Sequence, residues 1–236
     1  MTPDGEVVEE EETAKEVLLP DTTIVTHCIY KNDLIRFTEC FENEEDPYKE
    51  TVQDLMNERD DDGKSPLDIA AILGRSDLSR ELLTRGALLD NISEKGYCAW
   101  HYAAAWGSVD VLKVLFDFSA NFQQKNAFGE RARETALRYS KTECVDFLDW
   151  AEAKIHLIDL IKTVQESVTD LTKTQGVITK EEKNIAVNCC KEKNEWLEVT
   201  TDATTQDFIS QRESMDIIVA PIMQKINDPP EKPEKK

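Results

Sequence analysis

Basic residues and long apolar runs are what this 236-residue sequence has least of. Lys and Arg number 28 against 48 Asp and Glu, which gives a formal net charge of −20. Sequence-independent binding to nucleic acids depends on basic side chains that neutralise phosphates, and anionic membranes attract the same side chains. No apolar run has the length needed to span a bilayer. We therefore expect neither a nucleic-acid partner nor a membrane partner.

Patterns typical of metal, cofactor and secretion signals are also missing. The six Cys have no framework spacing, and the adjacent Cys189 and Cys190 lack the second pair that a zinc site uses. The eight Gly are scattered, and none forms a phosphate-binding P-loop. The first residues are acidic and lack the apolar core of a signal peptide. We expect a reduced, cytoplasmic chain that holds no metal and no cofactor.

A period of 33 residues is present in the centre of the chain. One copy reads Asp62-Gly-Lys-Ser-Pro-Leu-Asp-Ile-Ala-Ala-Ile-Leu-Gly, and the next reads Lys95-Gly-Tyr-Cys-Ala-Trp-His-Tyr-Ala-Ala-Ala-Trp-Gly. Ser65 can cap a helix that Pro66 begins, and Gly74 and Gly107 can end the first helix of each copy. Because one copy cannot bury its own apolar face, neighbouring copies must stack. This pattern resembles the ankyrin-repeat family.

The resemblance implies an all-α fold with a short ankyrin-repeat solenoid. Two clear repeats, 60–92 and 93–125, lie between degenerate end repeats, and the whole array is expected over 21–153. The leading repeat lacks the helix-ending Gly near Tyr30, and an acidic insertion with a helix over 51–59 follows it. In the last repeat Ser140 replaces that Gly. Residues 1–20 and 228–236 are expected to be disordered, since they are polar and charged.

A second helical segment follows the array. Apolar residues recur at three and four positions from Leu157 to Val168, which predicts an amphipathic connecting helix over 154–177. Residues 178–227 contain Trp196-Leu, an Ala-Thr helix start at 203 and Pro221-Ile. They resemble the helical C-terminal subdomain of the seventy-kilodalton heat-shock chaperones. The nucleotide-binding domain and the client-binding β-sandwich of those chaperones are absent, so the resemblance implies a small helical bundle without ATPase activity.

Three further expectations concern the helices of this bundle. Thr204 or Thr205 is the expected N-cap of the last helix, and Pro221 should kink or break that helix. Apolar spacing places Ile185, Cys189 and Trp196 on one buried face. The same spacing places a second set on another buried face: Phe208, Met215, Ile218 and Ile222.

The ankyrin register also selects candidate protein-binding residues in pairs. In that family, partners are held at the turn tips and on the concave side of the inner helices. The candidates are Lys64 and Tyr97 at the turns, Ile69 and Tyr102 where the exposed side of the inner helix begins, and Leu73 and Trp106 before its last Gly. Exposed Trp and Tyr are typical of interface hot spots. The alternative for Trp106 is that it packs under the acidic insertion.

Cys98 and His101 are three residues apart at a predicted helix start and could be read as a nucleophile and its base. No oxyanion hole and no third orienting group accompany them, so we expect no catalytic residue. The ankyrin resemblance implies instead that His101 hydrogen-bonds the turn region of the array, with Asp68 in its place one repeat earlier.

These observations favour a non-enzymatic intracellular scaffold for protein–protein interaction. The alternative is a co-chaperone-like regulator that engages the heat-shock chaperone system or its clients through the C-terminal helices, which could also mediate self-association. The combination of array and lid-like tail resembles a vertebrate ankyrin-repeat protein of the cleavage furrow and midbody. That resemblance alone implies a place in cell division.

Overall fold

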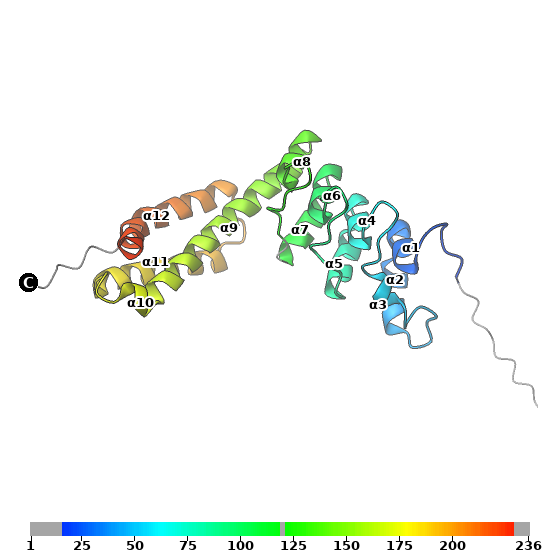
Figure 1. Ribbon diagram of the computed structural model, residues 1–236, viewed down its shortest axis with the longest axis horizontal. Helices are drawn as coiled ribbons and strands as arrows, with labels where there is room; N and C mark the ends of the chain where they lie inside the picture. The colour runs from blue at the N-terminus through cyan, green and yellow to red at the C-terminus, as the bar shows by residue number, and fades with distance from the viewer. Residues whose placement is uncertain (1–15, 119–120, 229–236) are drawn as a thin grey trace, which may run out of the picture. The chain divides into compact units, whose positions relative to one another are not determined.

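A computed structural model describes residues 16–118 and 121–228 of the chain (Figure 1). The described residues form helices and no strand, which confirms the all-α fold. The chain divides into two compact units, one up to residue 145 and one from residue 146. Residues 1–15 and 229–236, most of the two segments expected to be disordered, lie outside the described residues.

The first unit is a series of helix pairs that follow one another in chain order (Figure 1). The inner helices α1, α4, α6 and α8 contact one another in that order, and the outer helices α5 and α7 also contact each other. The short α3 lies in the insertion between the first two pairs. The pairs are α1 (Ile24–Lys31) with α2 (Leu34–Glu42), α4 (Pro66–Ile72) with α5 (Ser76–Thr84), α6 (Ala99–Trp106) with α7 (Val109–Asp117), and α8 (Ala132–Arg138) with the start of α9 (Thr142–Thr169); α3 is Val52–Leu55.

Each inner helix begins with the same local hydrogen bond. The residue before the helix donates its backbone N–H to the side chain three positions later, which satisfies one N–H at the helix start. The accepting side chains are Thr26, Asp68, His101 and Glu134, at 2.9, 2.9, 3.3 and 2.9 Å. The chemistry of the acceptor changes from repeat to repeat while its position does not.

Each inner helix also ends in the same way, with a residue of left-handed backbone. Gly74 and Gly107 have φ of 67° and 83°, as the sequence predicts, and Ser140 takes this conformation at 55°. In the leading repeat Asn32 holds the same position at 56°, two residues after Tyr30. Asn tolerates this region better than most residues, so the missing Gly is replaced without loss of the turn.

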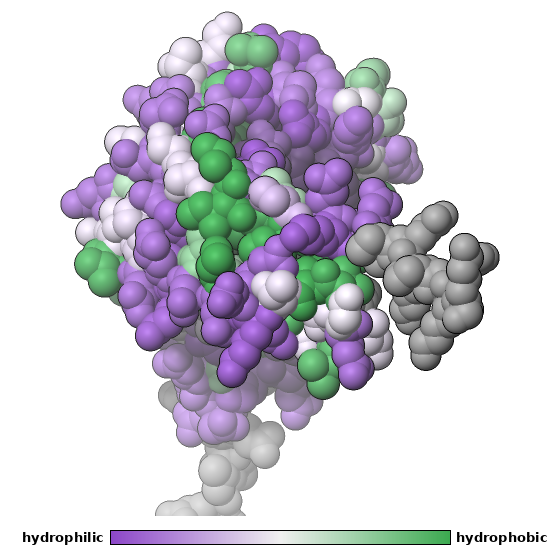
Figure 2. Space-filling view, turned by 90° about the vertical axis from the view of Figure 1, so that its left-hand side faces the viewer, coloured by the Kyte–Doolittle hydropathy of each residue, from purple (hydrophilic) through white to green (hydrophobic). Residues whose placement is uncertain are grey.

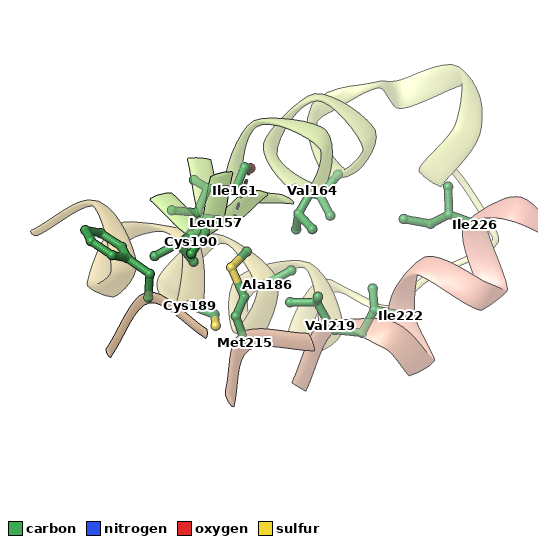
Figure 3. Packing of buried hydrophobic residues seen from close by; sticks show 13 residues of the cluster. Leu157, Ile161, Val164, Ala186, Cys189, Cys190, Met215, Val219, Ile222 and Ile226 are labelled. Atoms are coloured by element: carbon green, nitrogen blue, oxygen red, sulfur yellow. Dashed lines mark hydrogen bonds between the residues drawn. The ribbon is translucent and has the colours of Figure 1, made fainter. Parts of the chain in front are cut away.

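The second unit is a bundle in which α9, α11 (Lys180–Val199) and α12 (Thr205–Asn227) share one core, with the short α10 (Leu171–Thr174) between α9 and α11. Figure 3 shows how side chains of the three helices meet. They are Leu157, Ile161 and Val164 from α9, Ala186, Cys189 and Cys190 from α11, and Met215, Val219, Ile222 and Ile226 from α12. The Cys190 thiol lies 3.8 Å from the Ile161 carbonyl, so it packs in the core.

Two expectations for this unit are wrong in detail. Ile185 and Ile218 are 50% and 43% exposed, and their neighbours Ala186 and Val219 face the core instead. The other expected positions hold, since Cys189, Phe208, Met215 and Ile222 are buried. In addition, α12 continues through Pro221, so the expected break is wrong and the expected kink stays a prediction. Thr204 caps the helix as predicted.

The boundary between array and bundle lies inside one helix. The sequence placed the end of the array at residue 153 and a separate connecting helix over 154–177. In the structure α9 runs for 28 residues from Thr142 to Thr169. No Gly or Pro occurs in that stretch, so no residue stops the outer helix of the fourth repeat.

Candidate functional site

Three of the predicted binding residues lie together on and before α6. Tyr102 and Trp106 are four residues apart, so they project from one side of the helix. Tyr97 lies in the turn before the helix, with its ring centroid 5.6 Å from that of Tyr102. Trp106 is 62% exposed, whereas the two Tyr are half-buried. The exposure of Trp106 contradicts the alternative in which it packs under the acidic insertion.

Three residues of the fourth repeat extend this group, and the sequence reasoning missed them. Phe128 is 68% exposed and its ring lies 6.4 Å from that of Tyr97. Tyr139 is half exposed and occupies the position of Trp106 one repeat later. Arg138 precedes it. The 33-residue offset from Trp106 was the signal that could have identified Tyr139. We call the following six residues the aromatic face: Tyr97, Tyr102, Trp106, Phe128, Arg138 and Tyr139.

Arg138 holds part of the aromatic face in place. Its guanidinium donates to the Tyr97 hydroxyl at 3.1 Å and pairs with Glu130 at 2.9 Å. The same guanidinium lies 4.6 Å from the centre of the Tyr139 ring, within the range of a cation–π contact. A positively charged group on these rings is therefore part of the folded protein itself.

The equivalent residues of the preceding repeat are placed differently. Ile69 was expected to start an exposed side of its helix, and this is wrong because it is 4% exposed. Helix α1 of the leading repeat packs against α4, and Ile69 becomes part of the lining of a surface pocket there. Leu73 is half-buried. Lys64 pairs with Asp60 at 3.8 Å and with Asp62.

A second pocket lies beside Trp106. It has a volume of about 260 Å³ and is lined by Gly107, by Lys141 and by the start of α9, including Glu143. The Lys141 side chain packs over Gly107, within 3.1 Å of where a Cβ would be. Trp106 thus borders a hollow between the third and fourth repeats.

The Cys98–His101 pair has a structural arrangement. Cys98 is 1% exposed, and burial raises the pKa of its thiol to about 11, so the thiol stays protonated at neutral pH. His101 Nε2 lies 3.1 Å from the carbonyl oxygen of Glu130 in the next repeat. Burial also lowers the pKa of His101. His101 therefore bonds the turn region, as the resemblance implied, and Cys98 lacks the thiolate a nucleophile needs.

The described part of the chain contains no group of three or more His, Cys, Asp or Glu side chains that could hold a metal ion. All six Cys are reduced and buried. Among residues 16–118 and 121–228, no helix combines the length and the apolar character needed to cross a membrane.

Comparisons with known proteins agree with this architecture. The family described as ankyrin repeats (3 copies) matches residues 39–126. Three similar proteins all carry the name ankyrin repeat domain-containing protein 45. The Danio rerio protein is 42% identical over 59% of this chain and 62% of its own length. The Homo sapiens protein is 37% identical over 80% of this chain and 71% of its own length. The Mus musculus protein is 36% identical over 94% of this chain and 87% of its own length. By its repeats and by these identities, the chain belongs to the ankyrin-repeat family of ankyrin repeat domain-containing protein 45.

Proposed function

We propose that this protein is a non-enzymatic scaffold that holds a segment of a protein partner on its aromatic face. Ankyrin repeats indicate a role in protein–protein interaction. The proposal adds which surface of the array binds the partner. The observation that supports it is the exposure of Trp106 and Phe128 beside Tyr97 and Tyr102. Trp, Tyr and Arg dominate interface energies, and this face combines all three.

The test is proximity labelling in cells with the full-length chain. The variant Trp106→Ala, Phe128→Ala removes two exposed rings, and truncation of such hot spots costs about 2 kcal/mol each. Specific neighbours should therefore disappear. The matched control is Ile35→Ala, Leu88→Ala, which removes two exposed apolar side chains elsewhere on the array. Equal thermal stability of all three proteins shows that folding is intact. An unchanged set of neighbours in the Trp106 variant would refute the proposal.

The second unit supports the alternative, a chaperone-linked role of the C-terminal helices. This unit has its own core, and Figure 2 shows hydrophobic residues gathered among hydrophilic ones on its viewed face. Ile217 and Ile218 are among its exposed apolar side chains. Heat-shock chaperones that co-purify with the full chain, and are lost with Ile217→Asp, Ile218→Asp but kept with Trp106→Ala, would support this role. Recovery of none would remove it.

Two other predictions rest on resemblance or composition. Self-association through the C-terminal helices predicts a concentration-dependent mass in sedimentation experiments. A place at the cleavage furrow and midbody predicts that a tagged chain gathers there in dividing cells, and a uniform distribution would contradict it.

A further inference from the structure

The aromatic face continues toward a pocket at the N-terminal end of the array. This pocket has a volume of about 320 Å³ and lies between the start of α1 and the turn over 58–64. Asp60, Lys64 and Ile69 line it, and Ile69 lies on α4, which packs against α6, the helix that carries Tyr102. The aromatic face and the pocket are therefore neighbouring parts of one surface.

The acidic and basic side chains around this surface differ in whether they already form ion pairs within the protein. Two basic side chains close to this surface are already paired, Lys64 with Asp60 and Asp62, and Arg138 with Glu130. In contrast, three carboxylates at the pocket end have no ion pair among the described residues: Asp21, Glu58 and Asp61.

Arg59 also lines the pocket, but its guanidinium donates to the carbonyl of Ile92 and, at 3.1 Å, to the side chain of Asn91. It does not neutralise the free carboxylates by direct pairing. At the other end of the face, Lys141 and Glu143 line one pocket beside Trp106 and balance each other. Attraction for a basic group is therefore greatest at the Asp60 end.

The array as a whole has the same sign. Residues 16–145 contain 24 acidic and 15 basic side chains. A field of this sign accelerates the approach of basic partners and repels acidic ones. The aromatic rings reinforce the preference, because Arg and Lys bind the faces of Tyr and Trp through cation–π contacts. Arg138 on Tyr139 is an example within the protein.

We infer that the occupant of the aromatic face is a partner segment in which Lys or Arg accompanies a large apolar side chain. Its basic residue pairs with Glu58 and Asp21 in the pocket, and its apolar residue lies against Tyr102 and Trp106. This inference rests on the proposed function, since it names the class of partner for that same surface.

The experiment selects ligands without assuming their sequence. Random 12-residue peptides displayed on phage are selected against the full-length chain, and the best binder is labelled for fluorescence anisotropy. Selected peptides should be enriched in Arg or Lys together with Trp, Phe or Leu. Their affinity should fall between 50 and 300 mM NaCl, because partly exposed ion pairs are screened.

Matched variants distinguish the binding role of the aromatic face from the basic and apolar character of the partner segment. Glu58→Gln, Asp21→Asn should weaken binding by roughly fivefold, as expected for two partly exposed ion pairs. Glu39→Gln, Asp54→Asn makes the same change of net charge at other exposed sites and should leave the affinity unchanged. If Trp106→Ala abolishes binding but the selected peptides are acidic or uncharged, or both charge variants behave alike, this inference is overturned and the proposed function stands. If no peptide is selected, or Trp106→Ala binds normally, both are overturned.

Discussion

Replacing Asp68 by Asn should remove a pH-dependent cost at the start of α4. Asp68 is 1% exposed, and its Oδ2 accepts the backbone N–H and the hydroxyl of Ser65, both at 2.9 Å. Its Oδ1 is buried and has no hydrogen-bond partner within the described residues. Burial without full hydrogen bonding disfavours the ionised carboxylate and raises its pKa from 3.8 to about 6.

The magnitude follows from the size of this shift. A shift of about two pKa units means that the contribution of Asp68 to the free energy of unfolding differs by roughly 3 kcal/mol between acidic and neutral pH. Because the folded-state pKa lies above the unfolded one, the folded protein binds the extra proton. The contribution is fully present below about pH 4 and is lost as the pH rises through 6. Asn cannot ionise, so above pH 6 the variant should be more stable than the wild-type protein.

Urea unfolding followed by circular dichroism between pH 5 and 8 measures this difference. About half of it, roughly 1.5 kcal/mol, should develop in that range. His101 contributes with the opposite sign, since its lowered pKa means stability that is lost as the pH falls below its ordinary value of 6.5. This contribution is common to both proteins and cancels. The exposed Asp54→Asn is the matched control. A difference between Asp68→Asn and wild type that does not change with pH would refute the reasoning.

Three further predictions test other parts of the array. The Arg131 guanidinium, 2.7 Å away, lowers the pKa of Glu134 to about 2, so Glu134→Gln should destabilise the protein at pH 7 by less than about 1 kcal/mol, given its partial exposure; urea midpoints should show this loss shrinking as the pH falls from 4.5 toward 2. Gly96→Ala should cost more in urea unfolding than Gly129→Ala: both have left-handed φ, 73° and 78°, but a Cβ at Gly96 would lie 2.9 Å from the backbone nitrogen of the next turn, whereas nothing lies within 4 Å at Gly129. Equal losses would contradict this account. Iodoacetamide should alkylate Cys98 only after unfolding, because the thiol is buried and protonated; mass spectrometry of the native protein that finds Cys98 modified would show otherwise.

The repeats could be predicted from the sequence because their determinants are local. A left-handed residue at Gly74, Gly107 and Ser140, and an accepting side chain three positions into the helix at Asp68, recur at fixed offsets. These features need only neighbours in the sequence, so a period of 33 residues carries them. Trp106 and Tyr97 could be placed on neighbouring parts of the array for the same reason, since their positions follow from the register.

The features that sequence reasoning missed depend on packing between elements. Ile69 occupies the position of the half-buried Tyr102, yet α1 covers it, and nothing in the repeat itself indicates that neighbour. Ile218 and Val219 have similar apolar character, so spacing alone does not decide which one faces the core. The helix α11 decides it by packing against α12. Phe128 was missed because a turn residue has no helical periodicity that could mark it.

The row formed by Asp68, His101 and Glu134 shows how position in the stack determines electrostatics. All three side chains accept the same kind of backbone hydrogen bond at the start of an inner helix. Asp68 lies in a repeat with a neighbour on each side, so it is desolvated and its pKa rises. Glu134 lies in the repeat that ends the array, remains partly exposed and has Arg131 beside it, so its pKa falls. One carboxylate thus opposes folding at neutral pH and the other supports it, because the stack gives them different surroundings.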